Sequence, residues 1–381
     1  MAWASSIRAE AQLRLATYHS DAARKGPGLL LHALLQGKDP QLHALAQVIA
    51  VLDADILLLH DIDLDAGGAT SAALGRFLAQ NGAPYPHILA PMPNAGVPSG
   101  LDLNGDGRLG RANDALGFGA FRGQGGMVLL SRLPIITEEL IDFTGLLWRD
   151  LPGAQLPRLS DGTPFPSAAA LDVQPLSAVG AWAVPLRLPG GAGRLWVMAF
   201  HASPPVFYGR EDRNGRRNAD ELRLWAQVLD GTMTPALPGQ YFVLMGVTNI
   251  DPVLGEGRRD GLQRLAQHPQ LHPDKTSPHQ GLPTVDWSGL GLGLRQASRI
   301  FPAPACHCAA AACCGPPHQA PRPTFSPRPA ATGPYGWILP CHPRPRPCPR
   351  RKLCKSDHRF LTPPAPIARP VTNRFTGDKK P

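Results

Sequence analysis

Histidine and carboxylate side chains follow directly after several apolar stretches of the chain. His19 ends the run LRLATYH, Asp61 follows DILLLH, and His201 ends LWVMAFH. Imidazole and carboxylate groups held at rigid strand ends are the ligands and polarising groups that metal-assisted hydrolysis requires. A carboxylate that follows nearly apolar residues is costly unless it is hydrogen-bonded or bound to a cation, so we expect Asp61 to be a ligand and Asp63 to be structural.

The apolar runs that precede these residues alternate with a helical pattern. We predict strands at residues 13–18, 55–59, 126–130, 195–200 and 241–245, and helices at residues 40–52 and 218–229, the second with Asn218 as its N-cap. This order is typical of an α/β domain, in which ligands gather at the carboxyl ends of strands. The sequence lacks a G-x-S-x-G elbow, a G-x-x-x-x-G-K-[ST] loop and a complete G-x-G-x-x-G after a strand, which argues against the corresponding enzyme classes.

The chain of 381 residues has a formal net charge of +9, but its two parts differ in composition. Residues 300–381 contain 13 of the 38 Lys+Arg and 2 of the 29 Asp+Glu, which leaves 25 − 27 = −2 for residues 1–299. All seven cysteines lie in the same C-terminal part, without the paired C-x2-C spacing of common zinc modules. We therefore predict a disordered tail, and the near-neutral remainder argues against binding of long duplex DNA.

Three regions follow from this division. They are an N-terminal extension (1–10), an α/β domain (11–295) and a Pro/Arg/Cys-rich tail (296–381). No apolar run approaches the roughly 18 residues of a membrane-spanning helix, so we expect no transmembrane segment. The first 15 residues contain no continuous apolar stretch, and no secretory signal is visible. Localisation, export included, and oligomeric state stay open.

The motifs ATYH, DADILLLHDID, GQGGMVLLSRLPI, WRDLPGAQLP, AFHASPPVFYGREDRNGRRNADELRLWA and FVLMGVTNIDP follow one another in the order of a known superfamily. In these motifs the sequence resembles the endonuclease/exonuclease/phosphatase superfamily, and more narrowly a bacterial branch with an Asp-rich insert. The resemblance implies the DNase I-like fold, an α/β four-layer sandwich of two packed mixed β-sheets flanked by helices. It also implies attack of water on a phosphate ester with Mg²⁺ or Mn²⁺ as the cofactor.

The resemblance assigns roles only to residues that match the family pattern. His201 matches the histidine that contacts and polarises the scissile phosphate, and Asn249 matches the asparagine of Gly-Asp-x-Asn. His19 stands in the place of an asparagine that helps to hold the metal, and Asp61 in the place of a glutamate ligand. We therefore expect His201 and Asn249 to be catalytic, and Asp61 and His19 to bind the metal.

Two parts of the family pattern are altered. Val247 stands where Gly-Asp-x-Asn has the aspartate that positions or activates water, and valine has neither a lone pair nor a titratable proton. The terminal Asp-His pair is matched by Asp357 and His358 in SDHRF, far down the tail, and we expect these two to be catalytic. The composition break and the returning motif would both follow if residues 296–355 were translated from a shifted reading frame.

Four polar residues after His201 suit the recognition of a phosphate. Arg213, Asn214, Arg217 and Asn218 could grip its oxygens, since guanidinium groups are planar and donate in pairs. The alternative is a solvated loop with a helix cap at Asn218.

A separate signal lies in LDLNGDGRLGRAND. Asp102, Asn104 and Asp106 fall at positions 1, 3 and 5 of a calcium loop, with Gly107 at its sharp turn. A loop that binds Ca²⁺ and an Asp/Asn/Gly turn without an ion are the two interpretations.

Three functions remain from different classes. The first is a metal-dependent phosphoesterase acting on a phosphodiester or phosphomonoester, with nucleic acid among the substrate classes. Its alternative is an inactive scaffold or a pseudoenzyme that binds a phosphate ligand, since Val247 removes an expected base. The third is a calcium-loaded surface domain with a basic tail.

Overall fold

The structure is a computed structural model. It describes residues 13–207, 209–237, 239, 241–272, 284–287, 293–304 and 335–339. The helices are α1 (Leu29–Gln36), α2 (Pro40–Leu52), α3 (Ala69–Gln80), α4 (Ala168–Val173), α5 (Arg213–Leu229) and α6 (Asp260–Ala266), with 3-10 turns at Ala112–Asp114, Thr137–Glu139, Trp148–Asp150 and Pro189–Gly191. The strands are β1 (Leu13–His19), β2 (Ile56–Ile62), β3 (His87–Leu89), β4 (Gly126–Ser131), β5 (Ile141–Asp142), β6 (Ala181–Arg187), β7 (Arg194–His201), β8 (Phe242–Val247), β9 (Val285–Trp287), β10 (Gly293–Arg295), β11 (Ser298–Pro302) and β12 (Tyr335–Leu339).

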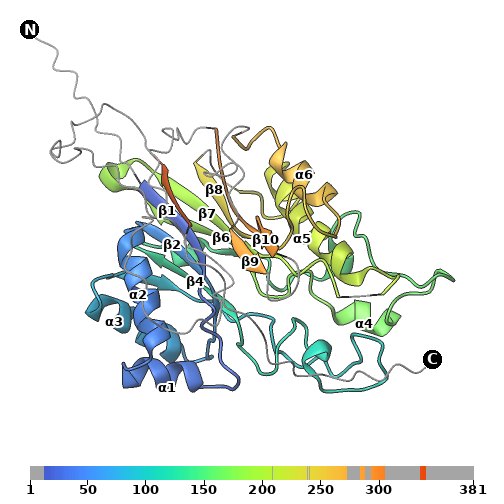
Figure 1. Ribbon diagram of the computed structural model, residues 1–381. Coiled ribbons are helices and arrows are strands. Elements are labelled where there is room, and N and C mark those ends of the chain that lie inside the picture. The colour runs from blue at the N-terminus through green and yellow to red at the C-terminus, as the bar shows by residue number, and fades with distance from the viewer. Residues whose placement is uncertain are drawn as a thin grey trace, which may run out of the picture. The chain divides into compact units, whose positions relative to one another are not determined.

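Two five-stranded sheets form the centre of the domain (Figure 1). The first has the order β12-β1-β2-β4-β3 and the second β11-β8-β7-β6-β5, while β9 and β10 form a separate pair. Each large sheet contains one parallel pair, β1 with β2 and β7 with β8, and its other neighbours are antiparallel. Both sheets are therefore mixed, as the sequence predicts.

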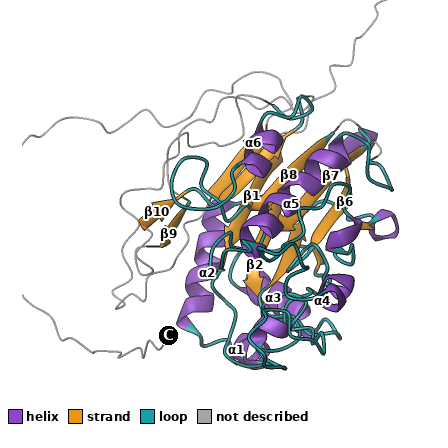
Figure 2. Ribbon diagram, turned by 90° about the vertical axis from the view of Figure 1, so that its right-hand side faces the viewer, coloured by secondary structure: helices purple, strands orange, loops and turns teal. Residues whose placement is uncertain are grey.

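Alternation along the strands explains why the sheets pack in layers. In β2, Ile56 and Leu58 contact the second sheet, whereas Leu57 and Leu59 belong to the cluster under α1, α2 and α3. Successive side chains of a strand point to opposite faces, so a strand that is apolar throughout is covered on both sides. Helices α5 and α6 cover the second sheet, which completes the four layers (Figure 2).

The expected strands and the helix at residues 40–52 are confirmed, but the predicted start of the second helix is wrong. Helix α5 begins at Arg213, with Asp212 as its N-cap residue. Asn218 is fully buried inside the helix, and its amide Nδ2 donates to the carbonyl oxygens of Ser203 and Thr248. The cap interpretation fails because the five residues before Asn218 already belong to the helix, and the buried amide pairs with loops instead.

Two strands lie beyond residue 295, where composition places the start of the tail. β11 pairs antiparallel with β8, and β12 pairs antiparallel with β1. Both segments, SRIFP and YGWIL, contain large apolar residues in a region otherwise rich in proline and arginine. The proposed boundaries of the three regions stay a prediction. Among the described helices, none has the length and apolar character required to cross a membrane.

Candidate active site at the strand ends

The two parallel strand pairs end with polar residues at matching positions. His19 lies beside His60 in the register of β1 and β2, and His201 lies beside Val247 in the register of β7 and β8. All four residues are at or near the carboxyl ends of their strands. Polar side chains gather at these ends because the apolar run of three of the four strands ends in a polar residue.

At these ends, three histidine rings from the two sheets lie close to one another. The ring centroids of His19 and His60 are 6.4 Å apart, those of His19 and His201 are 5.7 Å apart, and those of His60 and His201 are 5.1 Å apart. The rings of His19 and His60 are stacked, and His201 meets both edge-on. Residues 182 positions apart in the chain, His19 and His201, therefore belong to one site.

His19, Asp21 and Asp61 form a group that fits a divalent ion. One ligand atom from each residue lies within 4.8 Å of the other two, and His19 Nδ1 is 3.0 Å from Asp21 Oδ1. Ligand atoms that share an ion at about 2.1–2.4 Å can be at most about 4.8 Å apart, so the three side chains satisfy this condition. The structure thus brings together the two predicted metal ligands and adds Asp21.

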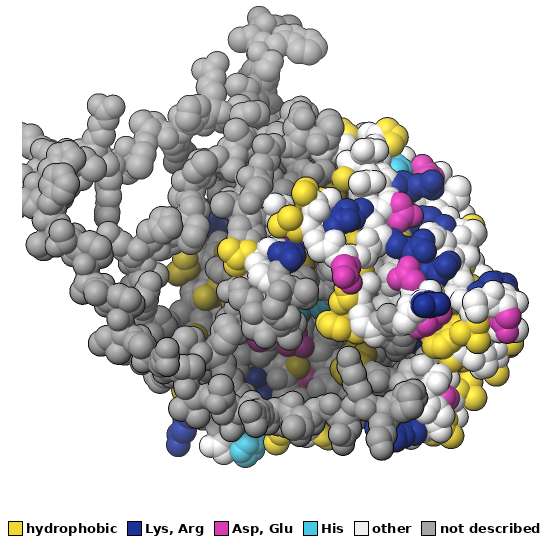
Figure 3. All heavy atoms as spheres, turned by 45° about the vertical axis from the view of Figure 1, so that its right-hand side comes forward, with side chains coloured by type: hydrophobic (Ala, Val, Ile, Leu, Met, Phe, Trp, Pro, Cys, Tyr) yellow, Lys and Arg dark blue, Asp and Glu magenta, His cyan; other side chains and the backbone are white. Residues whose placement is uncertain are grey.

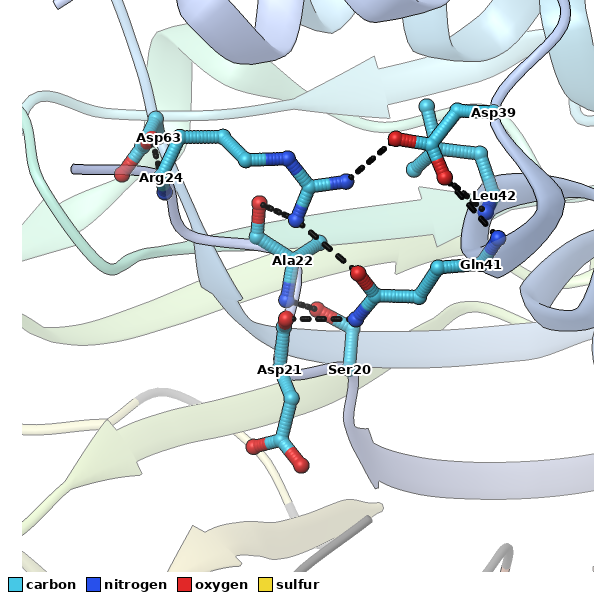
Figure 4. Close-up of polar contacts among 8 residues, drawn as sticks. All are labelled: Ser20, Asp21, Ala22, Arg24, Asp39, Gln41, Leu42 and Asp63. Carbon is cyan, nitrogen blue, oxygen red and sulfur yellow. Dashed lines mark hydrogen bonds and ion pairs between the residues drawn. The ribbon is translucent and has the colours of Figure 1, made fainter. Parts of the chain in front are cut away.

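The backbone around this group is pinned by hydrogen bonds (Figure 4). Ser20 Oγ donates to the carbonyl oxygen of His60, which ties the end of β1 to the end of β2. Gln41 Nε2, from α2, donates to the carbonyl oxygen of Asp21 at 2.6 Å. Figure 4 shows the carboxylate of Asp21 pointing away from these contacts. The loop is therefore held through its main chain, and the carboxylate of Asp21 lies beside His19.

Asp63 has the structural role expected from sequence. Its carboxylate accepts the backbone N–H groups of Arg24 at 2.7 Å and Gly125 at 3.1 Å. Arg24 in turn pairs with Asp39, the residue that caps α2. Asp63 thus fixes the loop that carries Asp21 against the loop before β4.

Burial determines the protonation of the site residues. Burial lowers the pKa of His201 to about 3, with a further contribution from His19, and it lowers the pKa of His60 well below its ordinary value. Both imidazoles are therefore neutral at neutral pH, and each carries one N–H donor. Burial raises the pKa of Asp61, although the nearby His19 opposes this shift. A buried carboxylate of this kind is stabilised by an adjacent cation.

Asn249 is held against the turn that follows His201. Asn249 Nδ2 donates to the carbonyl oxygen of Ala202 at 2.8 Å, and its φ of 52° lies in the left-handed region that few non-glycine residues adopt. Asp21 and Asp61, with φ of 50° and 62°, share this conformation. Such residues concentrate at functional sites because the surrounding structure must hold them there.

Glu221, on α5, lies beneath the same turn. Its carboxylate accepts the backbone N–H of Ser203 at 2.5 Å, the hydroxyl of Ser203 at 3.2 Å and the backbone N–H of Ala178 at 3.1 Å. Burial raises the pKa of Glu221 to about 7, while Arg217 and the hydrogen bonds from Ser203 and Ala178 oppose the shift. Glu221 and His201 line one small internal cavity.

The structure gives the four predicted phosphate-binding residues other partners. Arg217 donates to the carbonyl oxygens of Leu116, Pro175 and Leu176, and Arg213 donates to Gln174 Oε1. Asn214 Nδ2 donates to the carbonyl oxygen of Val206, and Asn218 joins two loops as described above. Phosphate binding by these side chains stays a prediction, and each of them already supports a loop near the site.

The loops that follow β7 and β8 line an open hollow of about 360 Å³. Its lining consists of Pro205, Val206, Phe207 and Asp212 from one loop and Glu256, Gly257 and Arg258 from the other. Arg258 Nε and Asp212 Oδ2, 2.6 Å apart, join the two loops. The hollow is thus lined by the two loops that begin at the carboxyl ends of β7 and β8.

The calcium-loop residues form a turn closed by hydrogen bonds. Asp102 accepts the backbone N–H groups of Gly105 at 2.6 Å and Gly107 at 2.8 Å. The side chains of Asn104 and Asp106 each accept the N–H two residues ahead. These bonds stabilise the turn without an ion, and Ca²⁺ binding stays a prediction.

Sequence reasoning missed three residues of the site. Asp21 lies two residues after a strand end and has no local pattern that marks it, while His60 lies within β2 and received no role. Glu221 was hidden inside an amphipathic helix. Asp357 and His358, the expected terminal pair, lie outside the described residues.

Comparison with known proteins identifies the family. The profile of the Endonuclease/Exonuclease/phosphatase family matches residues 31–379. The chain belongs to this family. Its members hydrolyse phosphate esters, nucleic acids among them, and generally depend on a divalent metal ion. The matched range begins after His19 and Asp21 and includes Asp357 and His358.

Solved structures of low sequence identity are similar to the chain. An endonuclease/exonuclease/phosphatase from Beutenbergia cavernae DSM 12333 is 18% identical, with a TM-score of 0.45 over 77% of this chain and 64% of that one. Sphingomyelinase C from Streptomyces griseocarneus is 15% identical, with a TM-score of 0.42 over 86% of this chain and 96% of that one. A family protein from Bacteroides thetaiotaomicron is 12% identical, with a TM-score of 0.42 over 77% of this chain and 84% of that one. No curated protein matches the chain.

Proposed function

We propose that the protein hydrolyses a phosphodiester or phosphomonoester by attack of water, with a divalent ion held by His19, Asp21 and Asp61. The observation that carries this proposal is the meeting of the two parallel strand pairs, which puts His201 5.7 Å from His19, ring centroid to ring centroid. A phosphate group at this junction would contact residues of both sheets. Family membership supports the reaction class.

Each residue has a task that follows from its environment. A divalent ion supplies positive charge that polarises a phosphoryl oxygen. His201, neutral because of its low pKa, donates its N–H to a phosphate oxygen and stabilises the charge that develops there. Asn249 is oriented by its bond to Ala202 and places its amide beside the same group. Arg213, Asn214, Arg217 and Asn218 fix the loops around the phosphate, and direct contacts from them to its oxygens belong to the same proposal.

A second candidate function is supported by Val247. This residue is the last of β8, lies beside His201 in the sheet and is 2% exposed. It cannot position or deprotonate water, so the site would bind a phosphate ligand without turning it over. The pseudoenzyme and the hydrolase share every other residue of the site.

The C-terminal region completes the proposal. Residues 1–10, 11–295 and 296–381 are proposed as extension, domain and tail, and Asp357 with His358 as the terminal catalytic pair. The family match, which continues to residue 379, supports the assignment of this pair. The nucleotide sequence across codons 290 to 360 tests it. The family pattern has an apolar-Asp-Tyr strand at the position that follows Arg295. A shifted frame that supplies this strand supports the pair, and a continuous frame favours the pseudoenzyme.

The charge of the protein surface bears on the size of the substrate. Figure 3 shows a face on which Lys and Arg side chains alternate with Asp and Glu side chains. A mixed surface offers a long duplex few consecutive cationic contacts. We therefore favour a compact phosphate ester over long duplex DNA.

The proposal is tested with bis(p-nitrophenyl) phosphate as a diester and p-nitrophenyl phosphate as a monoester, in the presence of Mg²⁺, Mn²⁺ or Zn²⁺. We expect metal-dependent release of nitrophenolate that falls about 100-fold or more in His201→Ala, since the variant lacks the donor to the phosphate. His43→Ala, on α2, is the matched control. A rate that is the same in His201→Ala and the parent overturns the proposal. No rate in the parent, with phosphate binding that His201→Ala abolishes, establishes the pseudoenzyme.

A further inference from the structure

We propose that the strand-end site selects a borderline transition ion of the Zn²⁺ or Co²⁺ class over Mg²⁺, because His19 supplies a nitrogen ligand beside the oxygens of Asp21 and Asp61. This inference rests on the proposed function, since both place an ion in the same site. It concerns the identity of the ion and the residue that determines it.

The donor set is the first support. Mg²⁺ takes oxygen ligands in near-ideal octahedral geometry and loses its water reluctantly, whereas imidazole nitrogen suits Zn²⁺ and its neighbours in the first transition row. His19 is the final residue of β1, and 22% of its side chain is exposed. The strand fixes its Cα, and Asp21 Oδ1 lies 3.0 Å from its Nδ1. An imidazole held beside two carboxylates is a mixed nitrogen and oxygen set.

The surroundings of His19 are the second support. His60 is fully buried, and its Nε2 is bonded to Thr17 Oγ1 at 2.9 Å. Its Nδ1, like Nδ1 of His201, is buried without a hydrogen-bond partner in the described part of the chain. A buried polar atom without a partner is costly, and an ion or its bound water is one group that can complete the bonding of such an atom. The rings that carry these atoms lie 6.4 Å and 5.7 Å from the ring of His19, centroid to centroid, so both adjoin the proposed ion site.

Replacement of His19 by asparagine separates donor class from charge. Asn offers an amide oxygen, which is an oxygen donor of the kind that Mg²⁺ accepts, and it leaves Asp21 and Asp61 unchanged. The Oδ1 atom of asparagine stands at the same position along the side chain as the Nδ1 atom of histidine. His19→Asn should therefore shift the preference between ions, while the carboxylates of Asp21 and Asp61 keep the negative charge of the site.

The test is calorimetric titration of the full-length chain, stripped of metal and with its cysteines alkylated, with Zn²⁺ and separately with Mg²⁺. Zn²⁺ binds more tightly than Mg²⁺ to most sites, so the ratio in the parent is not diagnostic, and its change in His19→Asn is. We expect the ratio of Zn²⁺ to Mg²⁺ affinity to fall at least 10-fold in His19→Asn. His32→Asn, an exposed histidine on α1, is the matched control and should leave the ratio unchanged.

The other outcomes separate the inference from the proposed function. If His19→Asn weakens both ions equally, or neither, His19 does not select the ion and the inference fails while the site remains. If Asp61→Asn also leaves the binding of every ion unchanged, the ion is not in this site and the proposed function fails too.

A measurement on the parent protein guards against a variant that does not fold. X-ray absorption at the zinc edge, with one equivalent of Zn²⁺ and alkylated cysteines, should show the outer-shell scattering of at least one imidazole. A first shell of oxygen alone would overturn the inference.

Discussion

Strands β1 and β2 carry His19, His60 and Asp61 at or near their carboxyl ends, whereas β7 and β8 end in His201 and Val247. Both pairs are parallel, lie in the middle of their sheets and stop at the same junction. The first pair presents nitrogen and oxygen donors, and the second presents one imidazole beside an apolar side chain. In the proposed function, metal binding and water activation therefore lie on separate sheets, so one can be lost while the other is kept.

The largest effect is expected from Val247→Asp, which adds a carboxylate to the second pair beside His201. If only the group that positions water is missing, the rate of phosphodiester hydrolysis should rise 10²- to 10⁴-fold, about 3 to 5 kcal/mol in the barrier. The rate with bis(p-nitrophenyl) phosphate measures this. Val247→Asn is the control, since it cannot act as a base. A folded Val247→Asp protein with the rate of the parent would show that more than this residue is lost.

Removal of a ligand from the first pair should have the next largest effect. Asp61→Asn replaces a charged ligand by a neutral one, and we expect the affinity for Zn²⁺ and Mn²⁺ to fall about 100-fold. Calorimetric titration measures the change. Asp65→Asn is the control, because Asp65 accepts the N–H groups of Ala69 and Thr70 at the start of α3 and asparagine caps helices well. Equal affinity in Asp61→Asn and Asp65→Asn would contradict the assignment.

Glu221 should make the free energy of unfolding depend on pH. Its pKa of about 7 in the folded protein is above the ordinary value of 4.5, so the folded chain holds this proton more tightly than the unfolded chain. The stabilisation is present in full below about pH 4.5 and is lost as the pH rises to about 7, a change of about 3 kcal/mol. Glutamine does not titrate, so Glu221→Gln should gain stability relative to the parent between pH 5 and 8. Urea unfolding at several pH values measures this, and a constant difference would contradict it.

The smallest effect is expected from the amide that joins the two turns of the second pair. Asn218→Ala leaves two buried carbonyl oxygens without a donor, and we expect the free energy of unfolding to fall by about 2 kcal/mol. Asn214→Ala loses one half-buried bond to Val206 and should cost about 1 kcal/mol or less. Thermal unfolding compares the two. Equal losses would show that the junction of the turns is not held by Asn218.

The sequence predicts the strand ends of the site better than the loops that surround them, for a physical reason. Apolar runs mark the strands, and the polar residues that end them, His19, Asp61 and His201, follow without further information. Asp21 joins them only because its loop turns through a left-handed conformation, which no local pattern reveals. The same holds for Asn218, whose amide finds carbonyl groups 15 and 30 residues away. Contacts that depend on how loops return to the sheet are not encoded locally.

The pairing of β1 with β12 has a consequence for the synthesis of the chain. Thr17 pairs with Tyr335, so 318 residues separate partners that lie side by side in the sheet. At about 5 to 20 residues per second, the ribosome needs on the order of tens of seconds to deliver the second strand after the first. During that time the outer edge of β1 is open to pairing with another chain. A nascent chain would therefore benefit from a chaperone that covers its first strand.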